Sequence, residues 1–189
     1  MTAARELQRR ESWRALQTAA IDLVGRRGFA AVTVDDVAAA AGVARRTFFN
    51  HFPTKAAALF DPDPDDADRL ASLLAEADGT VDLWSAMRSV CLAFVVGHEG
   101  VIEVRRRLVA EDPELDAYHR TAHRHVEVAL DGWARRQRPD DPFAAGLAAQ
   151  AAGAVLTSAF AAWHPDDDPD RFVQLVARGF DLVAGGFEP

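Results

Sequence analysis

The sequence predicts an all-α protein. Apolar residues recur three and four positions apart through most of the 189 residues, which is the period of an amphipathic helix. Glycine, proline and capping residues separate these runs, and no stretch alternates apolar and polar residues as a half-buried strand would. We therefore expect an N-terminal three-helix domain in residues 1–55 and a C-terminal helical domain in residues 56–189.

Charge is divided unevenly between these two parts. The net charge of the chain is −8, but residues 1–55 hold nine basic and five acidic side chains, a net +4. The remaining residues hold twelve basic and twenty-four acidic side chains, a net −12. A basic head on an acidic body is typical of a DNA-binding domain joined to a second domain.

Cysteine content and the N-terminus indicate the compartment. A single cysteine excludes an internal disulfide and suits a reducing environment. The first residues are polar and carry arginine, with no apolar run of the kind that forms a signal peptide. We expect a cytoplasmic protein.

The first helix is expected over residues 11–27, and residues 1–10 form either a flexible arm or a frayed extension of it. Thr33 then occupies an N-cap position ahead of the run TVDDVAAAAG, with Asp36 three residues later. Gly42 ends this second helix, since glycine takes a left-handed conformation without a steric penalty.

A third helix is expected over residues 45–51. Phe48 and Phe52, four positions apart, lie on its inner side. Two short helices joined by a tight glycine turn are the pattern of a helix-turn-helix.

The outer side of the third helix carries Arg45, Arg46, Thr47 and Asn50. Arginine can pair bidentately with guanine and asparagine with adenine, and threonine can touch a thymine methyl group or a phosphate. These side chains are therefore candidates to read double-stranded DNA, although arginines on a helix are often only solvated surface charges.

From residue 16 to residue 59 the chain resembles the DNA-binding domain of the tetracycline-repressor-like (TetR) family. The matching stretches are ALQTAAIDLVGRRGF, TVDDVAAAAGV and RRTFFNHFPTKAAAL. The resemblance implies that the third helix enters the major groove. It also implies phosphate contacts by the residues Thr33, Phe49, His51 and Lys55.

Two positions depart from the family pattern. The commonest family residue at position 49 is tyrosine, whose hydroxyl reaches the DNA backbone, and Phe49 cannot make that bond. Ala44 replaces a common capping serine. Beyond the third helix, Thr54 is expected to cap another helix that begins at Lys55, where backbone amides and the lysine attract phosphate.

After an acidic, proline-broken joint over residues 61–68, the chain reads as helices almost throughout. One of these is expected to be a long helix over residues 112–137. Residues 144–163 contain no charged side chain, which meets the length criterion for a membrane span. Because most of these residues are alanine, we favour a buried interface helix. Gly146 and Gly153 share a face there that would let a partner backbone approach.

The last two apolar helices can pair with their copies about a two-fold axis as a four-helix bundle. The family resemblance implies the same homodimer. A weaker resemblance, in LDGWARRQRPDDPF and the alanine-rich helix after it, points to a TetR subgroup whose members bind acyl-CoA-like molecules. Residues 105–107, three consecutive arginines, could meet a phosphate of such a ligand or simply face solvent.

Large apolar side chains in the acidic body are candidates to line a pocket for an apolar effector. The same spacing is equally that of a plain helical core. These candidates are Trp84, Met87, Val90, Cys91, Phe94, Tyr118, Trp133, Phe160 and Trp163.

The sequence shows no nucleophile elbow, phosphate-binding glycine loop or catalytic group set, so we expect no enzyme and no cofactor. His119 and His123 have metal-ligand spacing on one helix but no cysteine or HExxH partner, and we expect no metal. The favoured function is a ligand-responsive repressor of a palindromic operator. The alternative is an apolar-ligand carrier or buffer with a vestigial DNA-binding domain.

Overall fold

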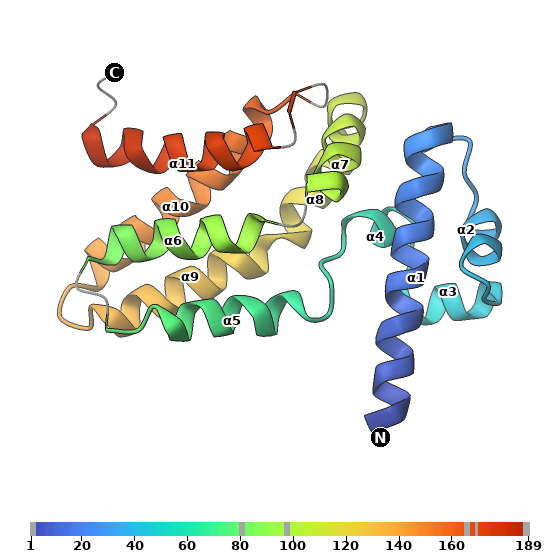
Figure 1. Cartoon of the computed structure of the whole chain (residues 1–189), viewed down its shortest axis with the longest axis horizontal. Coiled ribbons are helices and arrows are strands. Elements are labelled where there is room, and N and C mark those ends of the chain that lie inside the picture. The colour runs from blue at the N-terminus through green and yellow to red at the C-terminus, as the bar shows by residue number, and fades with distance from the viewer. Residues whose placement is uncertain (1–2, 80–81, 97–98, 165–166, 169, 187–189) are drawn as a thin grey trace. The chain divides into compact units, whose positions relative to one another are not determined.

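The computed structural model describes residues 3–79, 82–96, 99–164, 167–168 and 170–186. Every regular element within these residues is an α-helix, which confirms the predicted fold class (Figure 1). The chain divides into two compact units. Unit 1 contains residues 1–64 and 107–122, and unit 2 contains residues 65–106 and 123–189. The division into domains of residues 1–55 and 56–189 stays a prediction.

Unit 1 holds the helices that the sequence assigned to DNA binding. They are α1 (Ala3–Arg27), α2 (Val34–Ala40), α3 (Arg45–His51) and α4 (Lys55–Phe60). Helix α1 packs against α2 and α4, and α2 packs against α3 (Figure 1). The last residues of α7 (Glu99–Glu111) and all of α8 (Pro113–Ala122) belong to the same unit.

The core of unit 1 joins α1 to α3. Trp13, Leu16 and Ala20 of α1 are buried together with Phe48 and Phe52. The ring of Phe52 lies 5.2 Å from that of Trp13 and 5.7 Å from that of Phe48, centroid to centroid. Buried aromatic side chains contribute strongly to a core, so these ring contacts hold α3 against α1.

Helix α8 packs against α4. The Tyr118 hydroxyl donates a hydrogen bond to Asp61 Oδ1 at 2.8 Å, and its ring lies 6.1 Å from that of Phe60. Gln17 of α1 donates to the Asp61 carbonyl oxygen at 2.9 Å, and Arg14 pairs with Asp63 at 2.7 Å. The first half of the expected joint is therefore fastened to α1 and α8.

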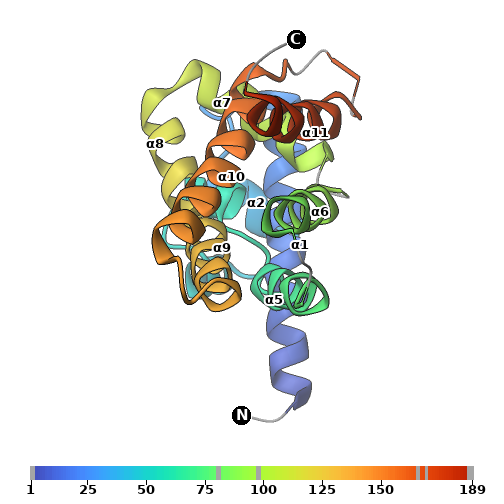
Figure 2. The ribbon, with the colours of Figure 1, turned by 90° about the vertical axis from the view of Figure 1, so that its left-hand side faces the viewer.

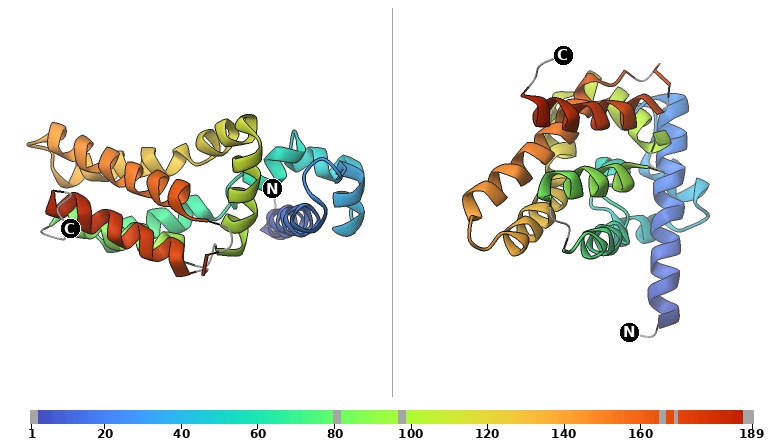
Figure 3. Two further views of the ribbon diagram at one scale, coloured as in Figure 1. Left: turned by 90° about the horizontal axis from the view of Figure 1, so that it is seen from above. Right: turned by 60° about the vertical axis from the view of Figure 1, so that its left-hand side comes forward.

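Unit 2 is a bundle of α5 (Asp66–Glu76), α6 (Leu83–Val95), α9 (Arg124–Gln137), α10 (Pro142–Ala162) and α11 (Asp170–Gly185), with the first residues of α7. Helix α10 packs against α6, α9 and α11, and α5 packs against α6 and α9 (Figure 2). The pairing of α9 with α10 and of α10 with α11 is visible from two further directions in Figure 3.

The first helix begins at Ala3, so of the two alternatives for residues 1–10 the structure favours an extension of that helix. One expectation about a helix was wrong. The helix expected over residues 112–137 is broken at His123, between α8 and α9. The break falls where the chain passes from one compact unit to the other, which periodicity alone does not reveal. It also separates His119, in unit 1, from His123, in unit 2.

The glycines of α10 face α9 of the same chain. A Cβ atom on Gly146 would meet Arg135 Nη2 at 2.7 Å, and one on Gly153 would meet Glu127 Cγ at 3.5 Å. Both contacts come from α9 of the same chain, so α9 is the neighbour that these glycines admit. They let α9 side chains cross α10 closely.

Helix α10 is long and apolar enough to cross a membrane by length and composition, with a mean hydropathy of 1.4 over its most apolar window. Of that window, 39% is buried inside the fold. One such helix is a weak indication, because a core helix of a soluble protein meets the same criterion. Helix α10 packs against three other helices, as a core helix does.

Candidate nucleic-acid interface

Helix α2 begins with a capping box, as the sequence predicted. Thr33 Oγ1 accepts a hydrogen bond from the Asp36 amide at 3.1 Å, and the Thr33 amide donates to Asp36 Oδ2 at 2.8 Å. The Thr33 hydroxyl also donates to that carboxylate oxygen at 2.7 Å. These bonds from Thr33 hold the pKa of the Asp36 carboxyl below its ordinary value. They fix the start of α2, while the predicted phosphate contact of Thr33 stays a prediction.

The turn between α2 and α3 depends on Gly42. Its φ angle is +68°, a conformation that a residue with a Cβ atom rarely adopts. The Val43 amide donates to the Ala38 carbonyl oxygen at 2.9 Å, which closes the end of α2. Ala44 then precedes α3 without a side-chain cap, in agreement with its replacing a serine. The sharp turn sets α3 against α2 and turns its first residues outward.

Helix α3 has one buried and one exposed side. Phe48 and Phe52 are fully buried, whereas the side chains of Arg46 and Asn50 are exposed to solvent. Thr47 is half-buried. This confirms the orientation predicted from the spacing of the two phenylalanines. The side that the sequence assigned to base contacts is free of the protein core.

The first residue of α3 is held in place by two neighbours. Arg45 Nη1 donates to Asp35 Oδ2 of α2 at 2.6 Å. The Arg45 guanidinium carbon also lies 5.4 Å from the centre of the Phe49 ring, which is 46% exposed. Cation–π contact of this kind favours the charged group over the ring face. A candidate base-reading side chain is therefore already ordered on the protein surface.

His51 lies at the end of α3 and is half-buried. Within the described residues its Nδ1 atom has no hydrogen-bond partner. Burial lowers the pKa of His51 below its ordinary value of 6.5, and the charge of Arg9 lowers it further. The imidazole is therefore kept neutral near physiological pH, and its Nδ1 atom is buried within the fold.

Lys55 begins α4, after an N-cap in which Thr54 accepts from the Ala57 amide at 3.1 Å. Its ammonium group donates to the carbonyl oxygens of Phe29 and Val32, the latter at 2.7 Å. It also lies 3.9 Å from the centre of the Phe29 ring. Burial lowers the pKa of Lys55. Two of its three N–H donors therefore serve the connection between α1 and α2.

Asp35 and Phe29 were not identified from the sequence. In the sequence, Asp35 is only one residue of the run TVDDVAAAAG, and Phe29 is only the last residue of a stretch that matches the family. Their roles depend on residues 10 and 26 positions away along the chain. Such pairings arise from the way α2, α3 and α4 pack, and no local pattern reports them.

The candidate effector-binding residues mostly lie in the core of unit 2. Those buried there are Met87, Val90, Cys91, Phe94, Trp133 and Trp163. Phe160 and Trp84 are half-buried against the same core, and the Trp84 indole donates to the Phe180 carbonyl oxygen at 3.1 Å. Tyr118 belongs to unit 1 instead. The structure thus brings eight of the nine candidates into unit 2, where they are buried in its apolar core or pack against it.

Burial raises the pKa of the Cys91 thiol to about 12. A thiol of that kind stays protonated and unreactive at physiological pH. Cys91 therefore packs as an apolar residue of the core and does not act as a nucleophile.

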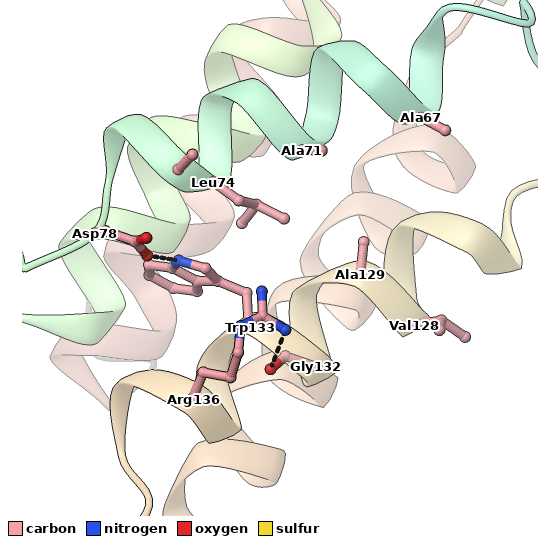
Figure 4. A pocket seen from close by; sticks show the side chains of 10 residues that line it. Ala67, Ala71, Leu74, Asp78, Val128, Ala129, Gly132, Trp133 and Arg136 are labelled. Atoms are coloured by element: carbon pink, nitrogen blue, oxygen red, sulfur yellow. Dashed lines mark hydrogen bonds between the residues drawn. The ribbon is translucent and has the colours of Figure 1, made fainter.

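A surface pocket of about 240 Å³ lies between α5 and α9 of unit 2 (Figure 4). Trp133 is the one predicted effector residue among those that line it, and its indole donates to Asp78 Oδ1 at 2.8 Å. The lining residues are Ala67, Ala71, Leu74, Ala75, Asp78, Val128, Ala129, Gly132, Trp133 and Arg136. The pocket is apolar along most of its length, with Arg136 as its basic group.

Comparison with known proteins agrees with the geometry of unit 1. Residues 16–61 match the family of bacterial regulatory proteins called the tetR family, and residues 81–188 match the MftR C-terminal domain. A Mycobacterium tuberculosis protein that carries the name of a mycofactocin biosynthesis transcriptional regulator, MftR, is 32% identical over 175 residues. The match covers 89% of this chain and 87% of that protein.

Solved structures share the fold at low sequence identity. A protein assigned to the TetR family from Syntrophomonas wolfei superposes with a TM-score of 0.70 at 16% identity, covering 94% of this chain and 97% of that one. The regulator FadR from Bacillus subtilis, in complex with stearoyl-CoA, gives 0.63 at 16% identity, covering 93% and 100%. FadR from Thermus thermophilus, in complex with lauroyl-CoA, gives 0.58 at 20% identity, covering 94% and 95%.

Both parts of the chain thus match domains of one group of regulators. The same chain has the capping box, the glycine turn and the outward face of α3. The chain belongs to the TetR family of bacterial transcriptional regulators and carries a C-terminal domain of the MftR type.

Proposed function

We propose that this regulator is a homodimeric repressor that binds a palindromic operator in the cytoplasm and is released by an apolar or acyl-CoA-like effector. The observation that carries the proposal is the orientation of α3, with Phe48 and Phe52 buried and Arg46 and Asn50 exposed. Members of the family are transcriptional regulators and not enzymes, so a binding function suits the chain.

In the proposed complex, α3 of each subunit lies in the major groove. Arg45, Arg46 and Asn50 meet base edges, and Thr47 meets a base or a phosphate. Two such helices in a dimer read half-sites separated by about 34–36 Å or a multiple of that distance. The symmetry of the protein then requires a palindromic sequence.

Backbone contacts would fix the register of α3 in the groove. Thr33, at the start of α2, and His51, at the end of α3, flank the base-reading face and are proposed to meet phosphates. Lys55 has one N–H donor beyond those that bind Phe29 and Val32, and that donor is proposed to do the same. Phe49 has no hydroxyl to offer a phosphate.

The proposed dimer forms through α10 and α11. Helix α10 exposes Phe143 and Leu147, one turn apart, with exposed fractions of 78% and 57%. Large apolar side chains in such a patch favour a partner surface. Two copies of α10 and α11 about a two-fold axis would bury these side chains in a four-helix bundle.

The proposed effector is apolar and enters the core of unit 2. Structures of similar fold hold stearoyl-CoA and lauroyl-CoA, which supports an acyl-CoA-like molecule for this chain as well. The candidate walls are Met87, Val90, Cys91 and Phe94 of α6, with Trp133, Phe160 and Trp163 facing the same core. Trp84 lies at its edge. An effector can release DNA only if it prefers one arrangement of the protein over another.

The name of the 32% identical relative suggests where the operator lies. DNA flanking the gene of this chain, and flanking any neighbouring genes for mycofactocin biosynthesis, is the probe for fluorescence anisotropy. A repressor binds one duplex saturably, and palmitoyl-CoA lowers that affinity. A carrier with a vestigial DNA-binding domain binds palmitoyl-CoA but gives only weak association that does not saturate with any of these duplexes.

A further inference from the structure

We propose that Asp35 and Phe49 together position the Arg45 guanidinium, and so determine which base the regulator accepts at the position that Arg45 reads. The inference rests on the proposed DNA-binding function. Asp35 lies on α2 and not on the reading helix α3. In this proposal Asp35 affects base specificity through its contact with Arg45 of α3.

The carboxylate of Asp35 is the first anchor of Arg45. Asp35 lies in the first turn of α2, whose start is held by the capping box between Thr33 and Asp36 and whose inner face buries Val37. The Asp35 and Arg45 side chains are 62% and 61% exposed, and their closest N–O distance is 2.6 Å. An exposed ion pair contributes little to folding stability. Here the ion pair instead selects one direction for the long Arg45 side chain.

The second anchor is the ring of Phe49, one turn further along α3. The guanidinium carbon of Arg45 lies 5.4 Å from its centre. The ring itself stands nearly edge-on to the buried Phe48, with centroids 5.4 Å apart and an interplanar angle of 80°. An exposed aromatic side chain that rests on the core in this way gives Arg45 a rigid face to lie on. The absent tyrosine hydroxyl is not needed for that role.

Between these anchors the guanidinium keeps donors for DNA. The described contacts of Arg45 use Nη1, which leaves Nε and Nη2 to meet a base edge. Arginine recognises guanine by two parallel hydrogen bonds to O6 and N7, and this recognition depends on the direction of the guanidinium plane. A guanidinium that is already ordered loses less conformational entropy on binding. The matching base therefore gains more binding free energy than the other bases do.

Asp35 also acts against indiscriminate binding. A carboxylate beside the DNA repels phosphates on every sequence alike, and only a base that accepts from Arg45 compensates for that repulsion. Loss of Asp35 is therefore expected to have two opposite effects. Affinity for unrelated DNA stays equal or rises, whereas preference at the Arg45 position falls.

The experiment selects bound duplexes from a library with a randomised core, using the full-length protein, and sequences them. R45A first identifies the position that Arg45 reads. D35N and F49L are then compared with the wild-type chain. We expect the preference for guanine at that position to fall about fivefold in D35N and about two- to fivefold in F49L, with the other positions unchanged. F49Y keeps the ring and is expected to keep the preference.

A matched control removes another exposed carboxylate of unit 1. D22N breaks the surface pair of Asp22 with Arg26 on α1 and is expected to leave the selected motif unchanged. Thermal unfolding by circular dichroism checks that every variant is folded. These controls separate a loss of negative charge from a loss of positioning.

Three results would overturn the inference. D35N could keep the full preference at the Arg45 position, D35N could strengthen that preference, or R45A could select the same motif as the wild-type chain. In each case the wild-type protein still selects a motif, so its function as a sequence-specific DNA-binding regulator survives. The third result would remove only Arg45 from the proposed base contacts. If the wild-type protein selects no motif at all, the proposed function fails first, and this inference fails with it.

Discussion

The ammonium group of Lys55 lies 3.9 Å from the centre of the Phe29 ring and donates a hydrogen bond to the Phe29 carbonyl oxygen. These contacts tie the start of α4 to the connection between α1 and α2. The sequence suggested only a phosphate-binding role for Lys55. The structure adds an internal role for Lys55. The connection that Lys55 holds ends at Thr33, the N-cap of α2.

We predict that Lys55→Met lowers the free energy of unfolding by about 1 kcal/mol, because it removes charge-assisted hydrogen bonds while keeping an apolar stem. Urea unfolding followed by circular dichroism measures the change. R26M, on the exposed side of α1, is the control and is expected to be neutral within about 0.5 kcal/mol. Equal stability of K55M and the wild-type chain would show that the ammonium group has no internal role.

His51 makes stability sensitive to acid. Its pKa is lowered in the folded chain by burial and by Arg9, so below its ordinary pKa of 6.5 the unfolded chain binds the proton more readily. The stabilising effect of the neutral imidazole is thus complete above pH 6.5 and is lost as the pH falls through the folded value. We predict that H51Q loses less stability than the wild-type chain between about pH 7 and pH 5.

Urea midpoints at the two pH values, measured for both proteins, test this difference. H125Q is a control, since His125 lies in unit 2. A larger acid-induced loss in H51Q than in the wild-type chain would mean that the folded protein favours the protonated imidazole, contrary to the effects of burial and of the Arg9 charge.

Tyr118 is the one tyrosine of the sequence, so its titration can be followed directly by the ultraviolet absorbance of tyrosinate. Burial raises the pKa of Tyr118 to about 12, and its hydrogen bond to Asp61 acts in the same direction. We predict a midpoint near that value in the folded chain and a lower midpoint in D61N. A midpoint at the ordinary value of 10 in the folded protein would contradict the pairing of α8 with α4.

The helix-turn-helix was predictable because its signals are local. The capping box of Thr33 and Asp36, the left-handed Gly42 and the spacing of Phe48 and Phe52 all lie within twenty residues, and each appears in the structure as expected. Helix capping and a glycine turn need no partner from elsewhere in the chain. The outward face of α3 follows from them.

The helical body was less predictable because its contacts are distant in sequence. The break at His123 and the assignment of Tyr118 to unit 1 depend on where α8 packs, and periodicity within residues 112–137 does not encode that. Gly146 and Gly153 were expected to admit a partner backbone, and the neighbour at that face is α9 of the same chain. Residues spaced for a helix face do not reveal which neighbour covers that face.

Phe143 gives a direct test of the proposed dimer. We predict that F143E shifts the protein from dimer to monomer in light scattering, because a charge in an apolar interface is costly when it has no partner. V128E is the matched control, since Val128 of α9 is also exposed, by 61%, and is expected to leave the dimer intact. A dimer that survives F143E and L147E would place the interface elsewhere.

The ratio of two dissociation constants tests most directly the claim that the exposed side of α3 reads DNA sequence. Competition anisotropy compares the duplex preferred by the wild-type chain with a scrambled duplex, for the wild-type chain and for R45A/R46A. We predict a preference of about a thousandfold or more for the wild-type chain, falling close to one in the double variant. A double variant that keeps the full preference would contradict the claim.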